Sequence, residues 1–252
     1  MRFRLFWARV AQQQGIILLF VIAVATLWLA ATGRLTLYIH QRYVVFTTSM
    51  AAVALVMASA SASVITQSRA HQHTHFAWWR GITACVMVCM VAGMALFVPP
   101  TALTTTTATQ RGINKGAVTR LSADKLSQAS IFAQRDYSHL TIKEWAGLLA
   151  QTHDSAFYRG KTVNLTGFVT PDTADSQIFY VSRFVVTCCA VDAQAVGVPV
   201  YAPGWRERYQ PNSWVTVTGN FAAHPQQHRQ QPIVVMPRSV TSTTQPKEPY
   251  EY

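Results

Sequence analysis

The sequence predicts a membrane protein with two parts, a helical N-terminal region and a small, mostly β C-terminal domain. Three apolar runs fall within the first hundred residues. These hundred residues contain seven Arg and no acidic residue, whereas all 10 acidic residues of the chain lie at or after Asp124. From Gly160 onward the apolar residues recur with a period of two, as in half-buried strands. The two halves therefore need separate interpretation.

The three apolar runs are each close to the roughly 20 residues that cover about 30 Å of hydrocarbon. They cover residues 15–31, 44–65 and 81–98. The second is rich in Ala and Ser, which favours close packing against another helix. The third ends at Pro99 and Pro100, because proline lacks the amide donor that continues a helix. We therefore expect about three transmembrane helices within residues 1–100, surrounded by membrane lipids.

The basic residues beside these runs predict the orientation of the chain. Arginines are concentrated before the first run and between the second and third, with fewer between the first and second. The first group is Arg2, Arg4, Arg9, Arg69 and Arg80, and the second is Arg34 and Arg42. Because positive charge is retained in the cytoplasm, we expect a multi-pass protein of the cell membrane with a cytoplasmic N-terminus and an extracytoplasmic C-terminal domain.

Residues 101–135 predict a linker, because they contain a run of Thr and lack an apolar period. The domain that follows covers residues 136–240 and starts with a short helix over residues 141–151. Thr141 with Glu144 three residues later has the spacing of a capping box. Residues 241–252 are rich in Thr, Pro and charge, which predicts a disordered tail.

Five strands are predicted in the C-terminal domain. They begin near Val163 and cover residues 178–187, 196–201, 214–220 and 233–240, with Pro, Gly and Asn between them. A short helical connection is expected at residues 205–209, between the third and fourth strands. Five strands with one such connection predict a small open barrel of the OB-like type.

The adjacent thiols Cys188 and Cys189 are the sharpest chemical feature of the sequence. Because successive side chains of a strand point to opposite faces, both sulfurs can act together only where the backbone leaves the strand. Three interpretations remain open: a site for a ligand or a soft transition metal, a disulfide, or packing. Asp192 is placed to be a ligand or a hydrogen-bond acceptor, whereas a straight strand holds Arg183 too far away to activate Cys189.

Other groups carry weaker signals. Cys85 and Cys89 share a helix face in the third run, where packing is the expected role. The short tract His71, His73 and His75 lacks acidic or Cys neighbours and predicts a polar loop. No phosphate loop, nucleophile elbow or zinc-protease motif is present, so the sequence predicts a protein that is not an enzyme. Nucleic-acid binding is disfavoured, because the C-terminal half lacks a basic stripe with interleaved aromatics.

Several stretches of the sequence are similar to the YcgQ-like family of permease subunits. The similarity rests on the three apolar runs, on Pro99-Pro100 followed by QRG, on GKTVNLTGFV from Gly160, and above all on RFVVTCCAVDAQAVGVPV from Arg183. The resemblance implies an accessory subunit of a transport system with a larger multi-spanning permease as partner. It also implies functional positions at Arg183, Cys188, Cys189 and Asp192.

These observations give two hypotheses of different kinds. The first is a non-enzymatic subunit of a membrane permease complex, whose outer domain binds a ligand or partner. The second is a membrane-tethered thiol redox or metal-binding protein that uses the Cys188-Cys189 pair. The sequence identifies neither a cofactor nor a transported substrate.

Overall fold

The fold is described from a computed structural model of the 252-residue chain. The described residues are 2–67, 82, 83, 86, 88–90, 93, 102–115, 137, 140–152, 154–225 and 232–252. The chain divides into two compact units, Met1–Thr101 and Ala102–Tyr252, here called the N-terminal unit and the C-terminal unit. Each unit is described by itself.

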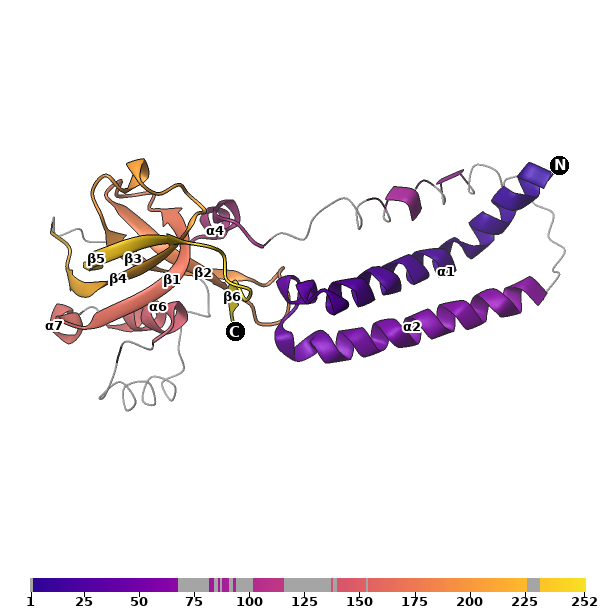
Figure 1. The fold of residues 1–252 in the computed structure, drawn as a ribbon, viewed down its shortest axis with the longest axis horizontal. Coiled ribbons are helices and arrows are strands. Elements are labelled where there is room, and N and C mark those ends of the chain that lie inside the picture. Colours follow the sequence, from indigo (N-terminus) through magenta and orange to yellow (C-terminus); the bar gives the residue numbers. More distant parts are fainter. Residues whose placement is uncertain are drawn as a thin grey trace. The chain divides into compact units, whose positions relative to one another are not determined.

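Two long helices form the described part of the N-terminal unit. Helix α1 covers Arg2–Ala31, and α2 covers Gln41–Gln67, with the short 3-10 helix η1 (Arg34–Leu37) between them. The chain turns at Gly33, whose positive φ of 70° suits glycine because it lacks a Cβ. Helices α1 and α2 lie side by side (Figure 1).

Small residues are buried in this helix pair, and large apolar residues are exposed. Ala23, Ala51 and Ala58 are each less than 9% exposed. In contrast, Phe46 and Val56 are 64% and 68% exposed. This distribution is the reverse of that in a water-soluble helix pair, and it follows from the Ala-rich composition of α2, which lets two backbones approach closely.

Among the described residues, Gln41–Ser61 is the one helical stretch long and apolar enough, by length and composition, to cross a membrane. Gly15–Ala31 is apolar but shorter. The predicted third helix, over 81–98, lies mostly outside the described residues.

The C-terminal unit combines five main strands with short helices. Its helices are α4 (Thr105–Arg111), α6 (Ile142–Gln151), α7 (Ser155–Tyr158) and the 3-10 helix η4 (Trp205–Glu207). Its strands are β1 (Thr162–Pro171), β2 (Ile178–Val185), β3 (Gln194–Tyr201), β4 (Trp214–Ala223), β5 (Ile233–Thr243) and β6 (Tyr250–Glu251). The mostly β character, the five predicted strands and the capping box of α6 are confirmed.

The pairing of strands β1 to β5 forms a ring. Strand β1 pairs antiparallel with both β2 and β4, β2 pairs with β3, and β4 pairs with β5. The ring is completed by a parallel contact between β3 and β5 at Val200 and Val235. Where β1 meets β2, a Cβ on Gly167 would lie 2.5 Å from the Ser182 carbonyl oxygen. Glycine is therefore required for the close approach of these two strands.

The main hydrophobic core lies between these strands and α6. In β4, buried and partly exposed residues alternate, as the period of two predicted. Trp145 of α6 and Trp205 of η4 are fully buried in this core. A second cluster lies elsewhere in the unit and combines Ala108 of α4, Phe168, Phe184, Val186, Ala193, Ala195 and Tyr250 of β6.

The structure differs from the predicted linker over 101–135 in residues 102–115, whereas residues 101 and 116–135 lie outside the described residues. Residues 102–115 belong to the C-terminal unit, and α4 packs on β1 and β3. Ala108 is fully buried, and the Thr105 hydroxyl donates a 3.1 Å hydrogen bond to the Val169 carbonyl. Helix α4 therefore has one buried face, although its Thr-rich composition is typical of a linker.

The structure also differs from the disordered tail predicted over 241–252. Strand β5 continues to Thr243, and β6 pairs with β2 in parallel, Tyr250 opposite Phe184. Tyr250 is only 4% exposed. Thr, Pro and charged residues are frequent in this stretch, but Tyr250 is part of the second cluster and Tyr252 packs against it.

Candidate functional site

The vicinal cysteines lie in the connection between β2 and β3, residues 186–193, here called the thiol loop. The backbone leaves the strand after Val185, so the alternation of faces ends before the pair. Cys188 is exposed and Cys189 is half-buried, and both thiols are free. The loop therefore presents two adjacent thiols, one of them open to solvent.

Asp192 orders the thiol loop from within. Its carboxylate oxygens accept hydrogen bonds from the backbone N–H groups of Cys188, at 2.7 Å, and of Cys189, at 3.3 Å. The N–H of Thr187 donates to the same carboxylate at 3.3 Å. The Asp192 N–H in turn donates to the Cys189 carbonyl at 3.0 Å. Three consecutive N–H groups thus share one anionic acceptor, which fixes the turn that carries both sulfurs.

Arg111 of α4 holds the other side of the thiol loop. Its Nη1 donates to the Ala193 carbonyl at 2.5 Å and, at 3.5 Å, to the Ala190 carbonyl. Sequence reasoning did not select Arg111 as a site residue, although Arg111 lies in the QRG stretch that contributes to the family resemblance. Its role depends on the docking of α4.

The surroundings of Cys188 disfavour the thiolate form of its side chain. Local desolvation raises its pKa above the ordinary value, and a hydrogen bond with the neighbouring Cys189 thiol and the negative charge of Asp192 raise it further. At neutral pH the side chain is therefore mainly a thiol, a weaker nucleophile than a thiolate. A reaction or a soft cation that takes the thiolate must first displace a proton.

Arg183 contacts residues of strands β1 and β4 rather than the thiol loop. It belongs to β2, where its Nε donates to the Thr166 carbonyl of β1 at 2.9 Å. Its guanidinium carbon lies 5.5 Å from the centre of the Trp214 ring. Burial lowers the pKa of Arg183, and the Glu251 carboxylate opposes that effect. The structure thus brings Cys188, Cys189 and Asp192 into one loop, while Arg183 joins β1, β4 and β6.

Two domains of one known protein family match most of the chain. The N-terminal domain of DUF1980 matches residues 14–114, and its C-terminal domain matches residues 124–252, more than half of the chain.

The chain belongs to the DUF1980 family.

This membership confirms the resemblance to a permease-subunit family. A protein of Streptococcus mutans serotype c is 23% identical over 257 residues, covering 90% of this DUF1980 chain and 94% of the relative's length. That relative is provisionally named a two-component membrane permease complex subunit. No solved structure matches the chain. Arg183 and the thiol loop lie in the C-terminal family domain, whereas Arg111 lies in the N-terminal one.

A metal centre has limited support in the described part of this DUF1980 chain. Within the described ranges, no three or more His, Cys, Asp or Glu side chains are grouped so that they could hold a metal ion. The Asp192 carboxylate accepts hydrogen bonds from backbone N–H groups of the thiol loop, which is the acceptor role that the sequence predicted beside that of a ligand. The predicted polar loop at His71, His73 and His75 lies outside the described residues, as does Cys85.

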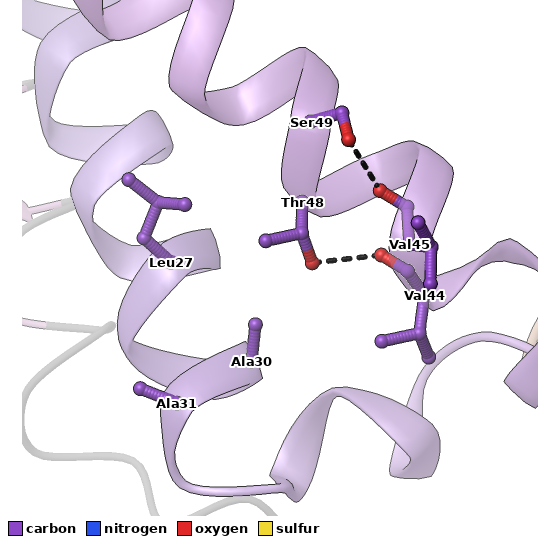
Figure 2. A pocket seen from close by; sticks show the side chains of 7 residues that line it. All are labelled: Leu27, Ala30, Ala31, Val44, Val45, Thr48 and Ser49. Carbon is purple, nitrogen blue, oxygen red and sulfur yellow. Dashed lines mark hydrogen bonds between the residues drawn. The ribbon is translucent and has the colours of Figure 1, made fainter.

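An apolar groove lies in the N-terminal unit of this DUF1980 chain, between the end of α1 and the start of α2. It has a volume of about 450 Å³ and is lined by Leu27, Ala30, Ala31, Val44, Val45, Thr48 and Ser49. Figure 2 shows that the hydroxyls of Thr48 and Ser49 turn back to the carbonyls of Val44 and Val45. These hydrogen bonds measure 2.7 Å and 2.9 Å. Because both hydroxyls are satisfied within the helix, the groove suits apolar chains.

A second pocket, of about 390 Å³, lies in the C-terminal unit. It is lined by Thr104, Thr105, Thr106, Thr109, Pro171, Pro211 and Asn212. The side-chain oxygen of Asn212 accepts a hydrogen bond from the Thr105 N–H at 3.0 Å, so these two lining residues are joined. Its hydroxyl lining offers hydrogen bonds but no charge.

Proposed function

We propose that this DUF1980 protein is a non-enzymatic accessory subunit of a membrane permease complex. The observation that carries the proposal is the match over 94% of the length of a relative named as such a subunit. The complex includes a larger multi-spanning permease, which provides the transport path. This chain provides an anchor in the membrane and a separate β domain.

The anchor consists of α1, α2 and the apolar run over 81–98, which together cross the membrane three times. Support comes from the exposed apolar side chains of the helix pair, of which Val45, at 75% exposed, is an example. Such side chains face lipid or a partner helix in a membrane. With a cytoplasmic N-terminus, this topology places the C-terminal unit outside the cytoplasm.

The C-terminal unit acts as an OB-like barrel that binds a ligand or partner of the permease. The ring of pairings and the parallel contact between β3 and β5 support this assignment. The connection η4 between β3 and β4 occupies the expected place. Because OB-like barrels bind many kinds of ligand, the barrel alone does not identify the cargo.

Co-purification tests this proposal. The tagged full chain is extracted in mild detergent from membranes of its own organism, and co-purified proteins are identified by mass spectrometry. We expect a large multi-spanning permease to accompany the full chain. A tagged fragment of residues 102–252 is the matched control, and we expect it to recover less permease because it lacks the helix pair. Recovery of the full chain alone, even after cross-linking in the membrane, would contradict the proposal.

A second candidate function is thiol chemistry at the thiol loop, favoured by the ordering of both cysteines by Asp192. Two chemistries are available to the pair. Cys188 and Cys189 can release two protons and bind a soft cation, with further ligands from a partner. Alternatively, exchange with an external disulfide oxidises the pair to a vicinal disulfide and leaves two reduced thiols on the oxidant.

A native mass spectrum of the full chain, purified without chelator or reductant, distinguishes these chemistries. Extra mass that matches a metal ion, lost in Cys188→Ser but kept in Cys89→Ser, supports cation binding. A mass lower by two hydrogens, which Cys188→Ser abolishes, supports the disulfide. An unmodified mass that also persists after incubation with zinc and with oxidised glutathione would exclude both chemistries.

A further inference from the structure

The last residues of the chain form a small strand that is attached by several independent contacts. Strand β6 runs parallel to the end of β2, with Tyr250 opposite Phe184 and Glu251 opposite Val185. The Val186 N–H donates to the Glu251 carbonyl at 3.0 Å. Two paired residues are a short strand, so side-chain contacts must provide most of the attachment.

Tyr250 provides the apolar part of this attachment. It is 4% exposed and packs edge-on against the Phe184 ring, with 6.5 Å between the ring centroids. Its hydroxyl accepts a hydrogen bond from the Leu103 N–H at 3.1 Å. The tyrosine therefore fills a site between β2 and the segment that precedes α4.

Glu251 provides the polar part. Its carboxylate accepts hydrogen bonds from the N–H groups of Ile142, at 3.3 Å, and Lys143, at 2.9 Å. These are the first N–H groups of α6, which have no partner within the helix and favour a negative charge. The positive charge of Arg183 acts on the same carboxylate. Lys143 Nζ also donates to the Tyr252 carbonyl at 3.1 Å.

We propose that residues 249–252, here called the C-terminal strap, occupy a peptide-binding groove, and that this groove binds the strap of a second copy of the chain when its own strap is displaced. The groove has the three elements of recognition by strand addition: a strand edge, a pocket for an alternate side chain and a hydrogen-bonding site for a carboxyl group. The second copy fits because its strap has the same sequence.

The connection to the rest of the chain permits this exchange. Residues 244–248 join β5 to the strap and are exposed, apart from a half-buried Pro246. An exposed connector loses little when the strap leaves, whereas the strap contacts are re-formed in the second copy. Confinement of two copies in one membrane raises their effective concentration and favours the exchange.

Occupation of the groove also affects the thiol loop. The hydrogen bond from Val186 to Glu251 lies directly before Thr187, where the thiol loop turns toward Asp192. Release of the strap frees the Val186 N–H and loosens the start of the loop. We therefore expect Cys188 to react faster with a maleimide when the groove is empty.

The test uses the full chain in detergent, with residues 244–248 replaced by a protease recognition sequence. After cleavage, a fluorescent peptide of residues 244–252 is added, and its anisotropy is measured. We expect saturable binding, and binding about tenfold or more weaker for the Glu251→Ala peptide, because the peptide loses two charge-assisted hydrogen bonds. A Glu248→Ala peptide is the matched control, since Glu248 is exposed, and should bind like the native peptide.

Two results would overturn the groove. In the first, the cleaved chain keeps its thermal unfolding midpoint but does not bind the added native peptide. The other is equal binding of the native and Glu251→Ala peptides.

A second variant tests the groove without cleavage, so its result does not depend on whether the cleaved chain stays folded. The uncleaved Glu251→Ala chain has a weakened strap of its own, so it should bind the native peptide at least about tenfold more tightly than the uncleaved native chain does. Equal binding by both chains would count against the groove.

Exchange between copies is tested by reconstituting two differently tagged full chains into the same liposomes. We expect the two tags to co-purify, and an excess of the 244–252 peptide to separate them. Co-purification that the peptide leaves unchanged, or no co-purification, would refute a second copy as the occupant.

Discussion

The role of Asp192 gives a quantitative prediction for the Asp192→Ala variant. The 2.7 Å hydrogen bond to the Cys188 N–H is charge-assisted and contributes about 1.5 kcal/mol, and each 3.3 Å bond contributes about 0.5 kcal/mol. Solvent around this half-exposed loop reduces the total to about 2 kcal/mol. Asp192→Asn keeps one acceptor oxygen, so we expect it to lose about half as much.

Urea unfolding of the full chain, followed by tryptophan fluorescence, measures this loss. With an m-value of about 2 kcal/mol/M, Asp192→Ala should lower the midpoint of the C-terminal unit by about 1 M and Asp192→Asn by about 0.5 M. Glu207→Ala, which changes an exposed carboxylate, is the control and should leave the midpoint nearly unchanged. A midpoint for Asp192→Ala within about 0.2 M of the native value, at unchanged m, would show that the carboxylate does not order the loop.

Three further predictions concern the C-terminal unit. Gly167→Ala should lower the unfolding free energy of the C-terminal unit by about 2 kcal/mol, because the new methyl group meets the Ser182 carbonyl. Urea unfolding measures this change. Gly15→Ala is the neutral control, because its new methyl group enters open space. Burial raises the pKa of Glu251 above its ordinary 4.5, so the folded state binds the proton of this carboxyl group more tightly than the unfolded state does. The stability that the protonated group contributes is therefore lost as pH rises through the raised pKa. Unfolding measured from about pH 4 to pH 7 should therefore show the native chain losing stability relative to Glu251→Gln, and a constant difference would refute the assignment. Arg111→Met removes the hydrogen bonds to the thiol loop, so the free energy that holds the loop in place should fall by about 1 kcal/mol and the thiols should react with a maleimide about fivefold faster. Arg111→Lys should have a smaller effect. Equal reaction rates for Arg111→Met and the native chain would show that Arg111 does not hold the loop.

Sequence patterns predicted the elements that depend on residues close to one another in the sequence. The capping box of α6 depends on two residues three positions apart, and the alternation in β4 is visible within ten residues. Asp192 also acts over a short range, since its partners are three to five residues away. Each of these features follows from the geometry of one helix turn, strand or loop.

Long-range contacts set the rest, and the sequence contains no signal for them. Arg111 reaches carbonyls 79 and 82 residues further along the chain. Glu251 accepts from N–H groups 108 and 109 residues away, so the composition of its neighbourhood wrongly suggested disorder. The ring of strands likewise depends on a single β3–β5 pair, Val200 with Val235. Tertiary packing, rather than propensity, decides these cases.

The position of α4 bears on how DUF1980 chains can recombine. The two family domains end and begin at residues 114 and 124, whereas the C-terminal unit begins at Ala102. Helix α4 therefore belongs to the N-terminal family domain but packs on strands that belong to the C-terminal family domain. A chimaera of two relatives joined near residue 120 would place α4 of one parent on strands β1 and β3 of the other, and the mismatch would fall on Ala108 and Arg111. A junction before residue 102 keeps the helix with the surface that it covers.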